Sequence, residues 1–204
     1  MAYQISHVVY AKKYLEKNPR SDADAFMLGT LFPDVRKVAP EIRRRDTHFI
    51  LQELNPDFSK LSPFRAGWKF HLWCDMRREE ILNGYEFYSL GEITDYEDGL
   101  TAKLLEDELV YERYNNWEKL CYLLNNPPAI ESSLPVSQET IERWYAVIAK
   151  YFEKKPDDRT IKIFLMKQPS FADDAEGIID SLRKLRNNLK VAEILTKISE
   201  EIII

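Results

Sequence analysis

The chain has 204 residues, of which 45% are apolar, and this is enough for one hydrophobic core, so we expect one domain over residues 1–204. The formal net charge of -5 argues against a broad basic surface, and we therefore predict no dedicated nucleic-acid-binding surface. The two cysteines, Cys74 and Cys121, are too few for a disulfide framework and favour a reducing compartment.

The first 19 residues lack the positively charged start, apolar stretch and cleavage site of a signal peptide. No apolar run approaches the roughly 18 residues that a membrane span requires. We therefore expect a cytoplasmic protein without a transmembrane segment.

Apolar residues recur with helical spacing along nearly the whole chain, which has only six glycines, and this pattern predicts an all-α, multi-helix bundle. A first helix is expected from about Ile5 to Leu15, before the break at residues 18–19. Ser21 resembles the N-cap of a second helix, which we expect to stop at Pro33. Asp34 is thereby placed just past a helix end.

Residues 35–61 have a mixed pattern, and their local structure stays open. Ser62 and Pro63 indicate the start of a long helix that reaches about Leu82 and carries His71 and Asp75. Residues 83–99 are rich in turn formers and predict an irregular connection. Further helices are expected at about residues 100–114, 117–124, 138–153, 158–166 and 171–203, the last with a break near residues 187–188.

The histidines are the most informative feature, because the chain has only three and all lie within its first 71 residues. His71 and Asp75 are four residues apart, so on a helix they share one face and can both reach one ion. Imidazole and carboxylate ligands suit zinc, and also iron, manganese, cobalt or nickel. The pair alone is weak evidence, since a pair on a helix surface or a core histidine gives the same pattern.

The order of the candidate ligands along the chain is more specific than any one pair. An early His7 is followed by the segment from Gly29 through Pro33-Asp34, by Thr47-His48, and by a helix with small Gly67 before His71 and Asp75. This order resembles the zinc-dependent phospholipase C family, to which the S1/P1 nucleases are structurally related. The resemblance covers about residues 1–80, a metal-ligand half, whereas residues 81–204 show no recognised motif.

The resemblance implies a helical bundle of the phospholipase C and P1 nuclease type, with zinc ions that cleave phosphoester bonds. It implies that Asp34, His48, His71 and Asp75 hold a first metal, and that His7 and Asp75 hold a second, with Asp75 as a bridge. Zinc is the metal expected, with iron, manganese, nickel or cobalt as alternatives. The substrate would be a small phosphoester or a lipid head group, and the oligomeric state stays open.

The sequence departs from the family downstream, where members with a full metal cluster have a further histidine and an H-x-x-x-E helix. No histidine follows His71, so one metal position is lost or rebuilt from carboxylates. The candidates for such a replacement are Glu79, Glu80, Asp95 and Asp98, and the sequence gives no basis for choosing among them.

The chemistry implied is the attack of a metal-activated water on phosphorus, with Asp34 and Asp75 as the catalytic carboxylates and Asp34 preferred as the base. Arg43, Arg44 and Arg45 could bind the substrate phosphate, although a solvated basic face explains them as well.

Two alternatives to a metal-dependent hydrolase stay open. The missing downstream ligands motivate a degenerate member, with a structural metal or none, that serves as an interaction module. An HD-type metal phosphohydrolase is the third class, but its adjacent His-Asp signature is absent, because Phe49 follows His48 and Leu72 follows His71.

Overall fold

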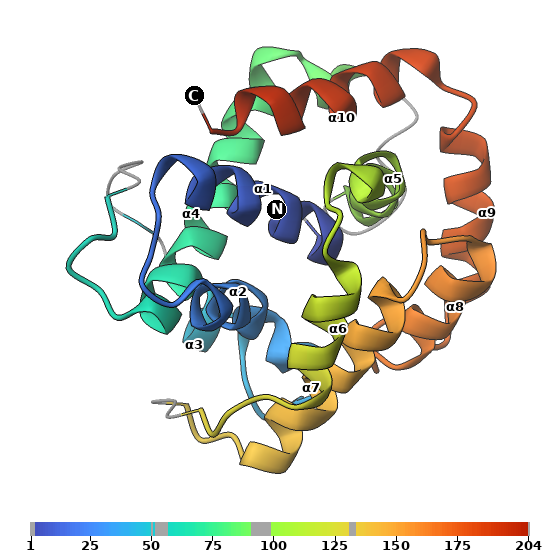
Figure 1. Ribbon diagram of the computed structural model, residues 1–204. Helices are drawn as coiled ribbons and strands as arrows, with labels where there is room; N and C mark the ends of the chain where they lie inside the picture. The colour runs from blue at the N-terminus through green and yellow to red at the C-terminus, as the bar shows by residue number, and fades with distance from the viewer. Residues whose placement is uncertain (1–2, 50, 52–56, 91–98, 131–133, 204) are drawn as a thin grey trace.

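The computed structural model describes residues 3–49, 51, 57–90, 99–130 and 134–203, and these residues form helices and connecting segments without any strand. The predicted all-α fold is therefore confirmed (Figure 1). The helices are α1 (Gln4–Lys17), α2 (Ala23–Leu31), η1 (Phe32–Lys37), α3 (Arg44–Thr47), α4 (Pro63–Gly84), η2 (Phe87–Ser89), α5 (Leu100–Val110), η4 (Tyr111–Arg113), α6 (Trp117–Asn125), α7 (Gln138–Phe152), α8 (Asp158–Met166), α9 (Ala175–Leu185) and α10 (Leu189–Glu201).

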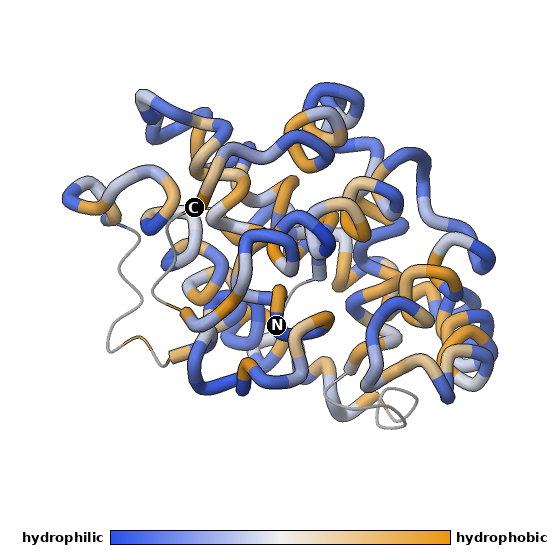
Figure 2. The backbone as a smooth tube through the Cα atoms, turned by 90° about the horizontal axis from the view of Figure 1, so that it is seen from below, coloured by the Kyte–Doolittle hydropathy of each residue, from blue (hydrophilic) through white to orange (hydrophobic). Residues whose placement is uncertain are grey.

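Helix α1 lies at the centre of the molecule, between α2 and α4 on one side and α5 on the other (Figure 1). Its position explains why residues on both faces of α1 are buried, among them Ile5, His7, Val9 and Tyr10. The later helices α7 to α10 continue around the α5 side, and each buries one apolar face. Figure 2 shows apolar and polar residues alternating along the helical turns of the molecule.

The beginning of α1 is capped by a side chain from another helix. Asp107 of α5 accepts hydrogen bonds from the backbone N–H groups of Ile5 (3.1 Å) and Ser6 (2.8 Å) and from the Ser6 hydroxyl (2.7 Å). The first N–H groups of a helix have no partner within the helix, so this carboxyl group satisfies them. The contact also fixes α1, and with it His7, relative to α5.

Helices α2 and α4 cross in close contact because glycine lies at the crossing on each of them. A Cβ atom built on Gly29 would lie 2.0 Å from the carbonyl oxygen of Phe64, and one built on Gly67 would lie 2.0 Å from that of Phe26. Any larger residue at either position would therefore overlap backbone atoms. The two glycines set the spacing of the two helices that carry or precede three of the candidate ligands.

Several boundaries differ from the sequence-based prediction. Asp22, not Ser21, caps α2, and its carboxylate accepts from the backbone N–H of Ala25 at 2.8 Å. Pro33 does not end the helical path but begins the 3-10 helix η1, since proline is tolerated in a first turn. Asp34 therefore lies within η1. No helix in the described residues combines the length and the low polarity that a membrane span requires.

Candidate metal centre

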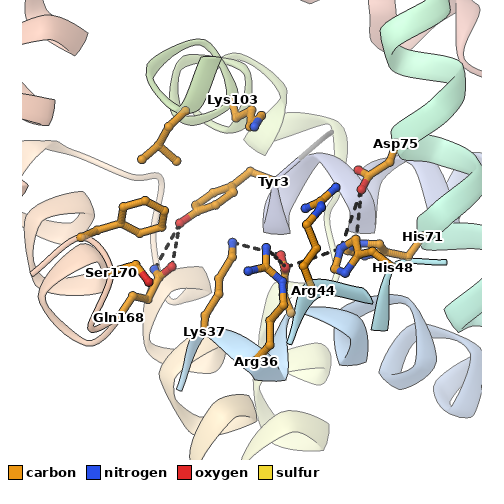
Figure 3. A pocket seen from close by; sticks show the side chains of 13 residues that line it. Tyr3, Arg36, Lys37, Arg44, His48, His71, Asp75, Lys103, Gln168 and Ser170 are labelled. Carbon is orange, nitrogen blue, oxygen red and sulfur yellow. Dashed lines mark hydrogen bonds and ion pairs between the residues drawn. The ribbon is translucent and has the colours of Figure 1, made fainter. Parts of the chain in front are cut away.

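The structure brings together the five side chains that the sequence proposes as metal ligands. His7 lies on α1, Asp34 in η1, His48 at the C-cap of α3, and His71 and Asp75 lie one turn apart on α4. All five side chains are at least nine-tenths buried. The elements that carry these residues are separated along the chain by loops and by α2. The five side chains therefore meet only because α1, η1, α3 and α4 pack together. Figure 3 shows His48, His71 and Asp75 pointing toward one another at one end of a cavity.

Asp34, His48 and His71 form one group whose ligand atoms all lie within 4.8 Å of one another, and a carboxylate oxygen of Asp75 lies close to both histidines of that group. Nε2 of His71 lies 3.2 Å from Nε2 of His48 and 3.7 Å from Oδ2 of Asp75. Nε2 of His48 lies 3.9 Å from Oδ2 of Asp75 and 3.8 Å from Oδ1 of Asp34. Tetrahedral zinc with bonds of about 2.1 Å separates its ligand atoms by about 3.4 Å. The distances from the two imidazoles to each other and to the carboxylate oxygens are therefore within about half an ångström of the spacing in a zinc ligand shell.

His7 approaches the same carboxylate from the other side. Its Nε2 lies 3.4 Å from Oδ1 of Asp75, whereas Nε2 of His48 and Nε2 of His71 face Oδ2. The ring of His7 stacks on that of His71, with 3.8 Å between ring centres. His7, His71 and Asp75 form a second group whose ligand atoms all lie within 4.8 Å of one another. Asp75 thus faces His7 with one oxygen and His48 and His71 with the other, as expected of a bridge, while His71 belongs to both groups.

Backbone carbonyls fix the tautomers of two histidines. Nδ1 of His7 lies 2.8 Å from the carbonyl oxygen of Tyr3, and Nδ1 of His71 lies 2.8 Å from that of Thr30. A carbonyl only accepts hydrogen bonds, so Nδ1 carries the proton and Nε2 presents a lone pair. Nε2 of His7 is buried and has no hydrogen-bond partner among the described residues. A buried nitrogen lone pair without a hydrogen bond is available to bind a cation.

His48 is held in place by contacts of its neighbour Thr47. The Thr47 hydroxyl lies 2.7 Å from Nδ1 of His48, an arrangement compatible with the same tautomer. The indole N–H of Trp68 on α4 donates to the carbonyl oxygen of Thr47 at 2.8 Å and so ties the short helix α3 to α4. If Nδ1 carries the proton on His48 as it does on His71, the Nε2 lone pairs of the two rings face each other at 3.2 Å. A cation between them relieves that repulsion, so this donor set fits a divalent metal.

The protonation states also suit metal binding. Burial lowers the pKa of His48 to about 4 and that of His71 well below its usual range, so both rings are neutral at physiological pH. Burial alone would raise the pKa of Asp34, but Lys37 and Arg36 hold it well below its usual range. Neutral imidazole and ionised carboxylate are the forms that bind metals.

Asp34 has further partners that position it. Oδ2 accepts hydrogen bonds from the Gln4 side chain at 2.6 Å and from the Lys37 ammonium at 3.0 Å. These contacts leave Oδ1 directed toward His48. A carboxylate with such a low pKa is a weak base, and the roles of Asp34 as a ligand and as the base stay predictions.

The three predicted arginines are all exposed, and only Arg44 lines the cavity beside the ligands. The cavity has a volume of about 200 Å³. Its other basic side chains are Arg36, Lys37 and Lys103, which sequence analysis missed. Lys103 lies on α5, and burial lowers its pKa to about 8. The only signal in the sequence is a lysine within a mostly apolar stretch, Leu100 to Leu105, and long side chains on helix surfaces give the same pattern.

The proposed replacement carboxylates do not join the ligand cluster in the described residues. Glu79 accepts a hydrogen bond from the hydroxyl of Tyr88 at 2.5 Å, and Glu80 is exposed and pairs with Arg77 at 2.6 Å. Asp95 and Asp98 lie outside the described residues.

Comparison with models of protein families, with curated proteins and with solved structures finds no match for this chain.

Proposed function

We propose that this protein is a metal-dependent hydrolase of phosphoester substrates. The observation that carries the proposal is the convergence of three imidazole Nε2 atoms and two carboxylates in one buried cluster at the end of a cavity. Buried acids and histidines are costly unless they pair or bind a metal. The resemblance to the zinc-dependent phospholipase C family, stated from the order of the same five residues, supports the same chemistry.

A divalent metal bound in this cluster would polarise a water molecule and neutralise negative charge on phosphoryl oxygens. His48, His71, Asp34 and Asp75 would hold the first ion, and His7 with the second oxygen of Asp75 would hold another. The hydrogen bonds from Nδ1 of His7 and His71 to backbone carbonyls keep these rings oriented, as partners of metal-bound histidines commonly do. In hydrolysis a water oxygen forms the new bond to phosphorus, while the bond to the alcohol oxygen breaks and the alcohol leaves with a proton.

Metal analysis of the purified protein tests the first part of this proposal. We expect zinc or another transition metal to co-purify or to bind after reconstitution, and we expect His71→Ala and Asp75→Ala to lower its occupancy at least tenfold. The exposed Asp173 offers a matched control, because Asp173→Ala also removes a carboxylate but lies on the surface. A protein that binds no divalent metal, or binds it equally well in all three variants, overturns the proposal.

Hydrolysis of chromogenic phosphoesters tests the second part. The metal-loaded protein should hydrolyse 4-nitrophenyl phosphate or bis(4-nitrophenyl) phosphate, and the His71 and Asp75 variants should lose that activity. Metal binding without hydrolysis of any phosphoester would instead favour the alternative of an interaction module with a structural metal. The absence of any histidine after His71 is the observation that supports this alternative.

A further inference from the structure

Lys103 is a buried lysine that forms no hydrogen bond and no ion pair with the described part of the chain. Only 4% of its surface is exposed, and the negative charges that attract its ammonium group, those of Asp75 and Glu79, act without a direct ion pair among the described residues. A buried charge without a partner is destabilising, and proteins seldom keep a buried lysine unless it pairs with an anion. Lys103 lines the same cavity as His48, His71 and Asp75, so the cavity is where such an anion would bind.

The other basic side chains of the cavity leave it with an excess of positive charge. Four basic residues, Arg36, Lys37, Arg44 and Lys103, line it together with only two acidic residues, Asp34 and Asp75. Lys37 and Arg36 share the single carboxylate of Asp34, and the Nε atom of Arg36 is buried without a hydrogen-bond partner in the described residues. The cavity is therefore formally positive before any metal binds.

These cations surround the cavity instead of forming one row. In Figure 3, Lys103 extends from α5 on one side of Tyr3, whereas Lys37 and Arg36 extend from η1 on the other side. The Lys37 ammonium lies 4.0 Å from the centre of the Tyr3 ring, which holds it near the cavity. Arg44 approaches from the side of His48. An anion with several oxygens can be contacted from more than one direction here.

We propose that Lys103, with Arg36 and Arg44, binds the terminal phosphate of a phosphomonoester and thereby makes the site selective for monoesters over diesters. This inference rests on the proposed phosphoester hydrolase function and narrows its substrate class. A monoester phosphate carries close to two negative charges and three unbridged oxygens at neutral pH, whereas a diester carries one charge and two such oxygens. Positive charge beyond that of the metal stabilises the dianion more than the monoanion. The third unbridged oxygen gives Lys103 an acceptor that a diester lacks.

Direct binding of small phosphates tests the proposal without relying on activity. By calorimetry at neutral pH, orthophosphate should bind the zinc-loaded protein at least tenfold more tightly than dimethyl phosphate. Lys103→Met should weaken orthophosphate binding by about tenfold or more, because it removes one charged hydrogen bond. It should change dimethyl phosphate binding much less. Lys190→Met is the matched control, since Lys190 is exposed on α10, outside the cavity, and loses the same charge.

Two further variants keep the test decisive. Lys103→Arg retains the charge and should retain most of the orthophosphate affinity. Arg44→Met changes an exposed side chain, so its folding is not at risk, and it should weaken orthophosphate more than dimethyl phosphate. If the wild-type protein does not prefer orthophosphate, or if Lys103→Met and Arg44→Met both leave its affinity unchanged, the proposal is overturned.

Failure of this inference can be told apart from failure of the proposed function. A protein that binds zinc and hydrolyses phosphoesters, but with equal preference for monoesters and diesters in wild type and Lys103→Met, would refute only the role of Lys103. A protein that binds no metal would refute the hydrolase, while orthophosphate binding to the metal-free protein would still report on Lys103. In that case loss of binding in Lys103→Met supports the phosphate subsite, and unchanged binding refutes it.

Discussion

Replacement of Gly29 by alanine should push α2 away from α4 and open the candidate metal centre. The added Cβ atom would lie 2.0 Å from the carbonyl oxygen of Phe64, whereas ordinary van der Waals contacts begin near 3.4 Å. The neighbouring atom belongs to the backbone of α4, so no side-chain rotation relieves the overlap. The two helices must therefore separate locally by about 1.4 Å, or their backbones must distort.

The stability cost and the effect on the metal can both be estimated. Overpacking of this kind costs about 3 kcal/mol, which exceeds the gain of up to about 1 kcal/mol that alanine brings to a helix interior. The carbonyl oxygen of Thr30, next to Gly29, accepts from His71 at 2.8 Å, and Asp34 follows α2 directly. Ligand distances in metal sites tolerate changes of about 0.2 Å, so a shift several times larger should lower zinc affinity by at least tenfold.

Denaturant unfolding and zinc titration of Gly29→Ala would check both effects. Gly84→Ala is the matched control in α4, because a Cβ atom there meets nothing within 4 Å, and we expect it to leave stability unchanged or slightly higher. If Gly29→Ala unfolded with a free energy within about 0.5 kcal/mol of wild type and bound zinc equally well, the close helix crossing would not set the ligand geometry.

Three further predictions concern pH, the metal and one hydrogen bond. Burial raises the pKa of Asp107 to about 7, so the folded state binds the proton more tightly than the unfolded state does. The contribution of Asp107 to the free energy of unfolding should therefore fall by roughly 2 to 3 kcal/mol from pH 5 to pH 8. Urea unfolding of wild type and Asp107→Asn across this range should show that loss in wild type alone, and equal slopes for both would contradict it. Chelation of zinc should lower the midpoint of thermal unfolding. A metal that binds only the native state stabilises it by about 4 kcal/mol when the free metal concentration is a thousand times the dissociation constant. An unchanged midpoint in calorimetry would argue against metal binding by the native state. Trp144→Phe removes the indole N–H that donates to the carbonyl oxygen of Leu31 at 2.9 Å, at the end of α2. We expect it to lower the free energy of unfolding, measured by chemical denaturation, by about 1 to 3 kcal/mol. No change would show that this hydrogen bond does not hold α7 against α2.

Much of the helical layout follows from local sequence signals. The apolar spacing in residues 138–153 and 158–166 predicts α7 and α8 to within a residue or two of the structure, and Pro63 marks the first turn of α4. The break near Asn188 appears as the N-cap of α10, where its side chain accepts from the backbone N–H of Val191 at 3.1 Å. Caps and prolines act over one helical turn, so their effect is visible in the sequence itself.

For the candidate ligands, too, some features follow from the sequence and others only from the tertiary structure. The i, i+4 spacing of His71 and Asp75 follows from helix geometry alone, and the order of the histidines led to the predicted set of five. The bridging position of Asp75, however, depends on α1 and α3 approaching opposite oxygens of one carboxylate. The sequence contains no local signal for that approach, because it results from packing between helices distant along the chain.

Lys103 shows most clearly what only the tertiary structure decided. In the sequence it is one of 29 basic residues on a helix with no motif around it, and nothing distinguishes it from a solvated lysine. Its burial follows from the packing of α5 against α1, which turns one face of α5 toward the cavity. The sequence by itself determined the helices and the chemical identity of the ligands, since both depend on residue type and short-range spacing. The place of Lys103 in the same cavity as the candidate ligands was decided by tertiary packing, because the burial and the surroundings of a side chain are properties of the whole fold.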